Sequence, residues 1–327
     1  MKTNFYTQNP RDIFKADFLP WEKLKNKKIF ITGGTGLIGR SLISSLILAS
    51  KELNLGLQIL ALVRDAENAK ERFGEAQKEI EIIGGSVERF LDMPQVDYVI
   101  HGASQTNSSE MVNHPVETIR TSIVGTLNML EGARRNKVES FIYLSSMEVY
   151  GFPPKGKKIS ENDIGCFNPL NLRNCYPISK IMCENMCRAY TSEYEVPAKI
   201  VRLTQTIGSG AGKNDNRIFA YIERCIREKS NIVLNTTGET ERSYISVIDA
   251  VTGILNVLLK GKNGMAYNVA DEDTYCSIAQ MAEHMAKENG IDVEYNLQSL
   301  CDNRYPQTIY MDLDTTLIKT LGWKPLL

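Results

Sequence analysis

The sequence predicts an α/β protein with a doubly wound parallel sheet. Three apolar runs, at residues 57–63, 97–101 and 141–144, have the continuous hydrophobicity of strands that are buried on both faces. Segments with helical spacing, at 40–51 and 115–136, precede the first run and separate the last two. Strands that alternate with helices in this way are typical of a parallel sheet with helices on both sides.

The composition narrows the class of protein further. The chain has 327 residues, of which 43% are hydrophobic and 24% charged, and its net charge is −1. This balance predicts a soluble globular protein without the field that would attract nucleic acid or an anionic membrane. Residues 42–49 are apolar but too few to span a bilayer, and residues 1–20 lack the apolar core of a signal peptide. We therefore expect a cytoplasmic protein with neither a membrane nor a nucleic acid as partner.

The seven cysteines are expected to be reduced and structural. Cys183 and Cys187 share a helix face through their spacing of four, which could favour a metal. The sequence offers no second cysteine pair and no nearby histidine to complete a zinc set. We therefore expect no metal site.

The predicted strand at 28–32 runs directly into a glycine-rich loop. Gly33, Gly36 and Gly39 have the spacing G-x-x-G-x-x-G, and the helix at 40–51 follows. Glycines at such a turn let the backbone approach a pyrophosphate, which then rests on the N–H groups of the helix N-terminus. This order of strand, loop and helix predicts a bound dinucleotide and a sheet of the Rossmann type.

We expect three parts along the chain. Residues 1–26 have the pattern of an irregular polar arm. Residues 27–203 would form the NAD(P)-binding Rossmann domain. Residues 204–327 would form a smaller C-terminal lobe that binds the substrate and is interleaved with that domain. A second glycine-rich loop, at 208–216, lies near the start of this lobe.

The residues after the predicted strand at 57–63 bear on which dinucleotide binds. An acid there accepts the 2′-hydroxyl of NAD, whereas an arginine accommodates the 2′-phosphate of NADP. Arg64 and Asp65 stand side by side and give both signals, and Arg64 could also be a solvated charge. These two residues leave the choice between the dinucleotides open. We expect NAD, with NADP as the alternative, because a reaction without net redox change, the type expected at the end of this section, suits a dinucleotide that is oxidised at rest.

A second group of residues predicts proton transfer. Tyr176 and Lys180 have the spacing Tyr-x-x-x-Lys, which places them one turn apart on one face of a helix. The charge of the lysine can lower the pKa of the phenol, so that the tyrosine can exchange a proton with a sugar hydroxyl or ketone. A serine hydroxyl at the end of the predicted strand at 141–144, where residues 145 and 146 are both serine, can hold the same oxygen.

With these motifs the chain resembles the extended short-chain dehydrogenases of the NAD-dependent epimerase/dehydratase type, which modify sugars attached to nucleotides. The similarity extends over residues 28–325. The matching segments are residues 33–39, 101–103, 145–151, 176–180, 242–250 and 321–325. The resemblance implies NAD(P) as cofactor, a nucleotide-diphosphate sugar as substrate, and a homodimer that pairs through the helices after Pro115 and from Tyr176.

The resemblance also implies roles for individual residues. Ser146, Glu148, Tyr176 and Lys180 would be catalytic. Gly33, Gly36, Leu37, Ile38, Gly39, Arg64 and Ala103, together with Tyr176 and Lys180, would bind the cofactor. Gln205, Arg217 and Arg242 would bind the nucleotide sugar, with the donors of Arg242 on its diphosphate. Each of these last three could instead be a surface or loop residue.

Glu148 bears on the type of reaction. Dehydratases and glucuronate decarboxylases of the family carry a glutamate here, whereas many 4-epimerases carry a small residue. A carboxylate near C5 of a transient 4-keto sugar can accept the acidified proton or assist the loss of a neighbouring group. The alternative is a structural role, in which the charge of Glu148 anchors the following loop. Met147 stands where glucose-type 4,6-dehydratases have an aspartate, which weakens that assignment, and Ser122 stands where relatives often have asparagine.

The function we expect is therefore a redox-neutral modification of a nucleotide-diphosphate sugar through a 4-keto intermediate, of the decarboxylase or dehydratase type. A nucleotide-sugar 4-epimerase is the next alternative, and an NADPH-dependent keto-sugar reductase, which Arg64 would suit, comes after it. A dinucleotide-sensing protein without catalysis is least favoured, because Ser146, Tyr176 and Lys180 are all present.

Overall fold

A parallel sheet forms the centre of the protein, whose structure is a computed structural model that describes residues 9–208, 217–297 and 308–326. Within these residues the sheet has seven strands in the order β11-β7-β5-β4-β1-β2-β3. The strands are β1 (Lys28–Thr32), β2 (Gln58–Val63), β3 (Glu81–Gly84), β4 (Tyr98–His101), β5 (Ser140–Ser146), β7 (Ala198–Leu203) and β11 (Ala266–Val269). The predicted parallel α/β sheet is thereby confirmed.

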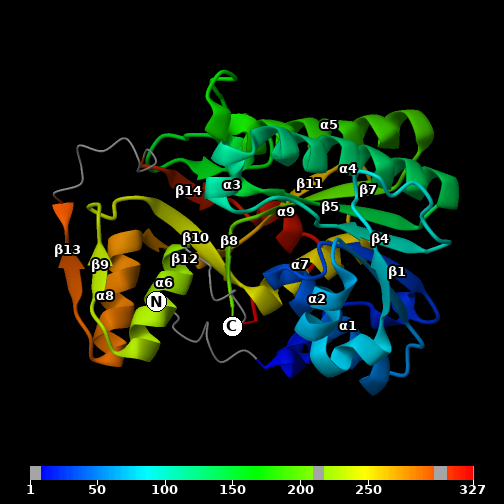
Figure 1. The fold of residues 1–327 in the computed structure, drawn as a ribbon, viewed down its shortest axis with the longest axis horizontal. Helices are drawn as coiled ribbons and strands as arrows, with labels where there is room; N and C mark the ends of the chain where they lie inside the picture. The colour runs from blue at the N-terminus through cyan, green and yellow to red at the C-terminus, as the bar shows by residue number, and fades with distance from the viewer. Residues whose placement is uncertain (1–8, 209–216, 298–307, 327) are drawn as a thin grey trace.

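Helices cover both faces of this sheet (Figure 1). One layer holds α3 (Ser108–Asn113), α4 (Pro115–Asn136) and α5 (Cys175–Tyr194), and the other holds α1 (Leu37–Glu52), α2 (Ala66–Phe73) and α7 (Val247–Lys260). Successive side chains of a strand point to opposite faces. Accordingly, Ile29 and Ile31 of β1 belong to the apolar core with α1 and α7, whereas Phe30 belongs to the core with α4 and α5. Burial on both faces explains why these strands are continuously apolar.

Helix boundaries follow local signals in the sequence. Helix α4 has the range predicted for it, with Pro115 in its first turn and Lys137 in the left-handed conformation at its end. Helix α1 begins three residues earlier than predicted, at Leu37, because Gly36 of the glycine-rich loop is its N-cap. The helix therefore opens directly out of the loop.

Residues after 204 also contribute a strand and a helix to the large sheet. Strand β11 pairs in parallel with β7 at the edge of this sheet, and α7 packs against its face. A second sheet has the order β12-β10-β14-β6, with β8 paired to β10. Its strands are β6 (Lys158–Ile159), β8 (Gln205–Ile207), β10 (Glu241–Ser246), β12 (Asp271–Ser277) and β14 (Tyr310–Leu313). Residues on both sides of the expected domain boundary thus contribute to each sheet.

A group of elements from the C-terminal part of the chain lies at the left of Figure 1. Helices α6 (Ile218–Glu228) and α8 (Ile278–Asn289) pack together beside the strand pair β9 (Ile232–Leu234) and β13 (Val293–Tyr295). Helix α9 (Thr316–Lys319) closes the described chain near β11. The short 3-10 helices are η1 (Pro10–Lys15), η2 (Trp21–Leu24), η3 (Gly74–Glu79), η4 (Met147–Tyr150) and η5 (Leu172–Asn174).

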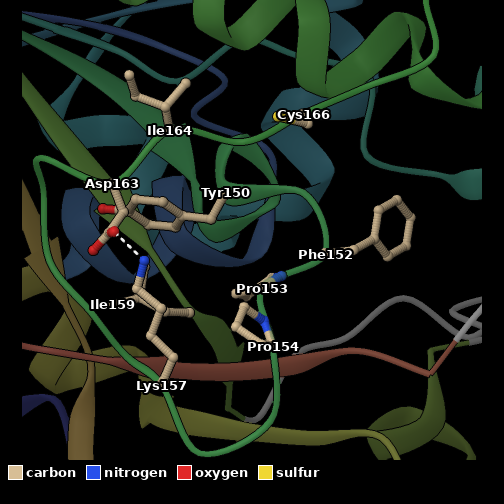
Figure 2. Close-up of a pocket in the computed structure, with 9 residues that line it drawn as sticks. All are labelled: Tyr150, Phe152, Pro153, Pro154, Lys157, Ile159, Asp163, Ile164 and Cys166. Carbon is tan, nitrogen blue, oxygen red and sulfur yellow. Dashed lines mark hydrogen bonds and ion pairs between the residues drawn. The ribbon is translucent and has the colours of Figure 1, made fainter.

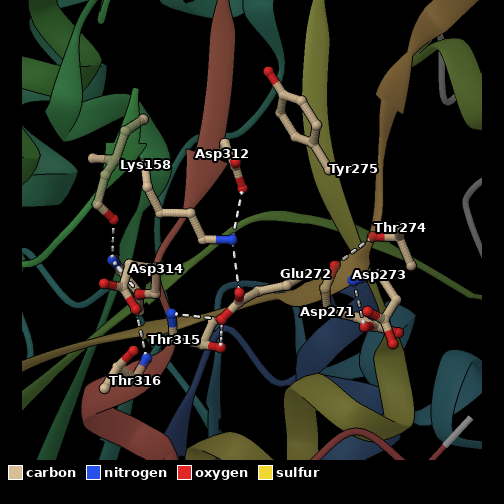
Figure 3. A network of polar contacts seen from close by, with 12 residues as sticks. Lys158, Asp271, Glu272, Asp273, Thr274, Tyr275, Asp312, Asp314, Thr315 and Thr316 are labelled. Atoms are coloured by element: carbon tan, nitrogen blue, oxygen red, sulfur yellow. Dashed lines mark hydrogen bonds and ion pairs between the residues drawn. The ribbon is translucent and has the colours of Figure 1, made fainter. Parts of the chain in front are cut away.

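Charged side chains connect strands of the second sheet (Figure 3). Glu272 of β12 accepts hydrogen bonds from Lys158 of β6 and from Lys319 of α9, at 2.7 and 2.8 Å. Its carboxylate also accepts the backbone N–H of Thr315 at 3.0 Å. Although burial opposes ionisation, these donors together lower the pKa of Glu272 to about 2. One carboxylate therefore joins three elements that are far apart in sequence.

The segment expected to be an irregular arm is ordered from residue 10 onward. It forms η1 and η2, and it buries Ile13 and Leu24 completely in the core that α1 and α7 share. Because the segment is polar overall, its sequence pattern did not indicate that these two side chains would be buried. The expectation of an irregular arm is wrong for residues 10–24, because burying these side chains offsets the cost of ordering the backbone.

Membrane-spanning helices and metal-binding clusters can be assessed for the described residues only. No helix among residues 9–208, 217–297 and 308–326 is long and apolar enough to cross a membrane. The same residues contain no cluster of histidine, cysteine, aspartate or glutamate side chains that could hold a metal ion. The six cysteines in these ranges are free thiols. The loop at 209–216 and Cys301 lie outside the described residues.

Candidate active site

Two positions of the glycine-rich loop have no space for a side chain. At Gly39 a Cβ atom would lie 2.3 Å from the carbonyl oxygen of Gly33, and at Gly33, where φ is +75°, it would lie 2.7 Å from the backbone of Gly102. Gly36 differs, because its Cβ would lie 3.4 Å from the nearest atom and the residue is exposed. No side chain caps the N-terminus of α1 at Gly36. The loop therefore presents an open cradle and free helix N–H groups, which fit the pyrophosphate of a dinucleotide.

A buried histidine holds the neighbouring loop in place. The Thr32 hydroxyl accepts the N–H groups of Gly102 and Ala103, at 3.2 and 3.1 Å. Its own hydrogen is then available to His101 Nδ1, 2.7 Å away, and His101 Nε2 lies 3.1 Å from the Thr126 hydroxyl. Burial, with the Lys180 charge adding to it, lowers the pKa of His101 to about 3. His101 is therefore a neutral structural residue, and it fixes Ala103 opposite the glycine loop.

The end of β2 holds the two residues that bear on the dinucleotide. Arg64 and Asp65 are both exposed just beyond Val63. The Asp65 carboxylate accepts the N–H of Asn68 at 3.0 Å and caps α2. Asp65 is thus engaged in holding the helix, while Arg64 is accessible beside the cradle.

The predicted proton-transfer pair lies at the start of α5. Tyr176 and Lys180 are 6% and 3% exposed, so both side chains are enclosed. Lys180 Nζ donates a hydrogen bond of 2.7 Å to the carbonyl oxygen of Leu144, at the end of β5. The same ammonium lies 4.7 Å from the ring centre of Tyr143 and 5.6 Å from that of Tyr176. The structure therefore brings the helix pair to the carboxyl end of β5, where Ser146 stands.

Electrostatics in this enclosure differ from the expectation. Burial raises the pKa of Tyr176, and the charge of Glu148 raises it further, although a hydrogen bond with Ser146 and the charge of Arg173 oppose both effects. Burial also lowers the pKa of Lys180 to about 8. The expected lowering of the phenol's pKa by Lys180 is therefore not found, because burial is the largest influence on this pKa and the Lys180 charge is not among its causes.

Ser146 and Glu148 stand on the turn that follows β5. The Ser146 hydroxyl accepts the N–H of Glu148 at 3.2 Å and so caps η4. The Glu148 carboxylate accepts a hydrogen bond of 3.1 Å from Arg173 Nη2. The structure thus places the predicted residues Ser146, Glu148 and Tyr176 in one neighbourhood, and it adds Arg173, which the sequence motifs did not single out.

A buried polar network lies directly behind these residues. Glu184 accepts the Ser145 hydroxyl at 2.5 Å and the guanidinium of Arg202 at 2.6 Å. Arg202 also donates to the Tyr150 hydroxyl at 2.9 Å, and Tyr150 donates to Asn268 of β11 at 2.6 Å. Sequence reasoning missed Glu184, although its place four residues after Lys180 puts it on the same helix face.

The three residues expected to bind the nucleotide sugar lie on the second sheet and α6. Gln205 opens β8 beside Tyr244 of β10, and Arg217 is the N-cap residue of α6. Arg242 of β10 has a buried Nε without a hydrogen-bond partner among the described residues. The Thr204 hydroxyl donates to the carbonyl oxygen of Ser243 at 2.5 Å and contacts the sulfur of Met147 at 3.4 Å. Thr204 therefore joins the strand of Arg242 to the turn that carries Glu148.

The loop after Tyr150 encloses a cavity of about 230 Å³ (Figure 2). Its lining residues are Tyr150, Phe152, Pro153, Pro154, Lys157, Ile159, Asp163, Ile164 and Cys166. Lys157 forms an ion pair with Asp163 across the loop. None of the residues predicted for the site lines this cavity.

Comparison with known proteins decides the family. The model of the NAD dependent epimerase/dehydratase family matches residues 29–270. The chain belongs to this family. As a member of it, the protein is an enzyme of the epimerase/dehydratase class, and its expected cofactor, NAD, is the one by which the family is described. The open glycine cradle fits that cofactor.

Proteins named for activities on nucleotide sugars are similar to this chain over most of its length. UDP-glucuronic acid decarboxylase 1 of Xenopus tropicalis is 28% identical over 97% of this chain and 74% of its own. UDP-glucuronic acid decarboxylase 6 of Arabidopsis thaliana is also 28% identical, over 92% of this chain and 84% of its own. The dTDP-D-glucose 4,6-dehydratase of Bos taurus is 26% identical over 91% and 84%.

Solved structures of family members share the fold. UDP-glucose 4-epimerase from Thermotoga maritima, solved with UDP-glucose, has a TM-score of 0.76 and 22% identity over 91% of this chain and 93% of its own. The dTDP-glucose 4,6-dehydratase of Streptomyces venezuelae, solved with NAD, has a TM-score of 0.74 and 20% identity over 91% and 92%. These likenesses confirm the predicted Rossmann-type architecture.

Proposed function

We propose that the protein is an NAD-dependent enzyme that modifies a nucleotide-diphosphate sugar through a transient 4-keto intermediate, as a decarboxylase or dehydratase does. The observation that carries this proposal is the position of Glu148 on η4, which packs against the helix of Tyr176 so that the Glu148 charge acts on the phenol. Relatives named as UDP-glucuronic acid decarboxylases and a dTDP-glucose dehydratase support it. The buried Nε of Arg242, for which the described part of the chain offers no hydrogen-bond partner, supports binding of the diphosphate.

Within this proposal Tyr176 is the proton-transfer residue. Its phenolate takes the proton of the C4 hydroxyl while the C4 hydrogen leaves with its electron pair. In a decarboxylation the phenol later returns a proton to the C4 oxygen as the hydrogen returns to C4, whereas in a dehydration C4 stays a ketone. Ser146 donates a hydrogen bond to the same oxygen, and Lys180 stabilises the negative charge. Bound NAD would accept the hydrogen at C4 and return it, and its positively charged ring would favour the phenolate.

Glu148 would act once C4 is a ketone. In a decarboxylation the C5–C6 bond breaks, its electron pair moves onto C5 and the C4 oxygen, carbon dioxide leaves, and C5 then takes a proton. In a dehydration C5 loses its proton and hydroxide leaves from C6, taking up a proton as water. The C5=C6 bond formed in this way then takes the hydrogen removed from C4 at its C6 end and a proton at C5, so that C4 stays a ketone. In both reactions a proton is exchanged at C5, which is the task proposed for Glu148.

Product analysis tests the proposal. The purified protein would be incubated with NAD and, separately, with UDP-glucuronate, UDP-glucose or dTDP-glucose, and the products would be identified by mass spectrometry. Loss of carbon dioxide from UDP-glucuronate supports a decarboxylase, and loss of water from a glucose derivative supports a dehydratase. An isomer of unchanged mass would instead support a 4-epimerase, and stoichiometric consumption of cofactor a reductase.

We also propose that the enzyme is a homodimer that pairs through α4 and α5. On α4, Val116, Ile119 and Leu127 are 60%, 42% and 40% exposed and recur at helical spacing. On α5, Ile181 and Met182 are 37% and 48% exposed. An apolar surface on two adjacent helices suits a self-complementary interface. Light scattering at micromolar concentration tests this, and a monomer would contradict it.

A further inference from the structure

The ion pair between Arg173 and Glu148 stands at the edge of the site rather than in the core. Arg173 belongs to η5, immediately before α5, and its side chain is 36% exposed, while that of Glu148 is 33% exposed. The backbone N–H of Arg173 donates to Asn171 Oδ1 at 3.1 Å, which holds the turn. The pair is therefore accessible and fixed in position by its local backbone.

Both members of the pair stand on elements that pack against α5, the helix of Tyr176: Glu148 on η4 and Arg173 on η5. Glu148 and Arg173 act on the pKa of Tyr176 in opposite directions, Glu148 raising it and Arg173 lowering it. In the proposed function the phenol of Tyr176 contacts the oxygen on C4 of the sugar. A substituent on C5 is only one carbon away from C4, so the group at C6 comes within reach of this ion pair.

A carboxylate at C6 could not be accommodated beside Glu148 alone, since two carboxylates repel each other. Arg173 changes this, because a guanidinium has five N–H donors in a planar fork. One hydrogen bond, from Nη2 to Glu148, is found for this side chain within the described part of the chain. The other donors can take a second carboxylate while the first remains bound.

We propose that Arg173 binds the C6 carboxylate of a uronate-type nucleotide sugar and thereby selects acidic sugars over neutral ones. The inference rests on the proposed function and narrows its substrate class. Arg173 would be a specificity-determining residue, because it acts on a group that a neutral hexose lacks.

The proposed contact contributes to binding more than to turnover. The substrate carboxylate carries its full charge when bound and loses that charge as it becomes carbon dioxide. Arg173 therefore stabilises the bound substrate at least as much as the transition state, and its removal should raise KM rather than lower kcat.

Binding measurements test the inference independently of turnover. Titration calorimetry with NAD present would compare UDP-glucuronate and UDP-glucose on the wild type and Arg173→Met. We expect Arg173→Met to weaken UDP-glucuronate about 10- to 100-fold, the range for a charge-assisted hydrogen bond, and UDP-glucose less than about twofold. Arg173→Lys should restore part of the loss. The matched control is Arg134→Met, which removes a similarly exposed ion pair with Glu131 on α4 and should change neither affinity.

A double variant separates direct contact from repulsion by an unpaired Glu148. If Arg173 contacts the carboxylate, Arg173→Met with Glu148→Gln should still bind UDP-glucuronate weakly, and full recovery would overturn the inference. Unchanged affinity in Arg173→Met, or an equal loss for both sugars, would overturn it while leaving the proposed function standing. If the wild type bound neither nucleotide sugar, the proposed function would fail and this inference with it. Thermal midpoints of all variants show that each is folded.

Discussion

The carboxylate of Glu184 lies 2.5 Å from the hydroxyl of Ser145, the residue next to the proposed catalytic serine. The same carboxylate pairs with Arg202, and the side chains of Glu184 and Arg202 are only 9% and 12% exposed. Through these contacts α5, β5 and β7 are joined behind Tyr176 and Lys180. A buried pair of this kind is sensitive to loss of one partner, because the other charge is then left uncompensated.

Arg202→Met is therefore expected to lower the free energy of unfolding by about 3–5 kcal/mol. Glu184→Gln should also destabilise the protein, because it leaves the Arg202 charge buried. The double variant should lose clearly less than the sum of the single variants, since neither charge then remains unpaired. Urea unfolding of all four proteins measures this cycle, and simple additivity would show that the pair is not coupled.

Tyr176→Phe and Lys180→Met are each expected to lower kcat by about 10²- to 10⁴-fold while the protein stays folded. The one-turn spacing makes the two residues a single proton-transfer unit, so the double variant should cost little more than either single one. Steady-state kinetics with circular dichroism as the check on folding would measure this. Wild-type turnover in either single variant would remove these residues from the mechanism.

Glu148→Gln is expected to bind cofactor and substrate almost as the wild type does, because the amide keeps the size and accepts a hydrogen bond from Arg173. It cannot exchange a proton at C5, so steps after oxidation at C4 should slow by about 10²- to 10⁴-fold. Single-turnover experiments should then show the absorbance of reduced nicotinamide together with a 4-keto sugar. A 4-epimerase or a reductase needs no base here, and full activity in Glu148→Gln would favour one of them.

The stability of the protein is expected to fall in mild acid because of His101. Its pKa is lowered to about 3 by burial, against 6.5 for an unperturbed histidine. Between these values the unfolded chain binds a proton that the folded protein does not, so stability is full above about pH 6.5 and declines toward pH 3. The contribution is at most about 4–5 kcal/mol for a shift of this size.

Chemical denaturation between pH 7 and pH 4 tests this expectation. His101→Gln should be less stable at pH 7 but should show a shallower loss of stability on acidification. The control is His114→Gln, since the side chain of His114 is 59% exposed. If His101→Gln and the wild type declined in parallel, the acid sensitivity would have to come from other groups.

Local patterns in the sequence were sufficient for β1, β2, β4 and β5 of the large sheet and for the central motifs. These four strands are largely buried, so each appears as an apolar run whatever its neighbours are. The glycine loop is contiguous, and Tyr176 and Lys180 are one turn apart on a single helix. These relationships are set within a few residues, and a pattern in the sequence can express them.

The second sheet and the arm could not be predicted in the same way. Strand β14, at 310–313, pairs with β10, at 241–246, and with β6, at 158–159, and both lie far from it in sequence. Residues 10–24 are ordered because Ile13 and Leu24 find a core made by α1 and α7. Which surface an isolated apolar residue meets is a long-range property, so a polar segment with a few such residues appeared irregular.

The sequence by itself determined the Rossmann-type sheet, the glycine-rich loop and the placement of Tyr176 and Lys180 one turn apart on a helix, since these depend on periodicity and short spacing. Only the tertiary structure decided that Arg173 meets Glu148, that Glu184 meets Ser145 and Arg202, and that burial raises the pKa of Tyr176. The physical reason is that charge and burial at a site depend on groups brought together by folding. Their energies are set by distance and desolvation in space, which spacing along the chain does not specify.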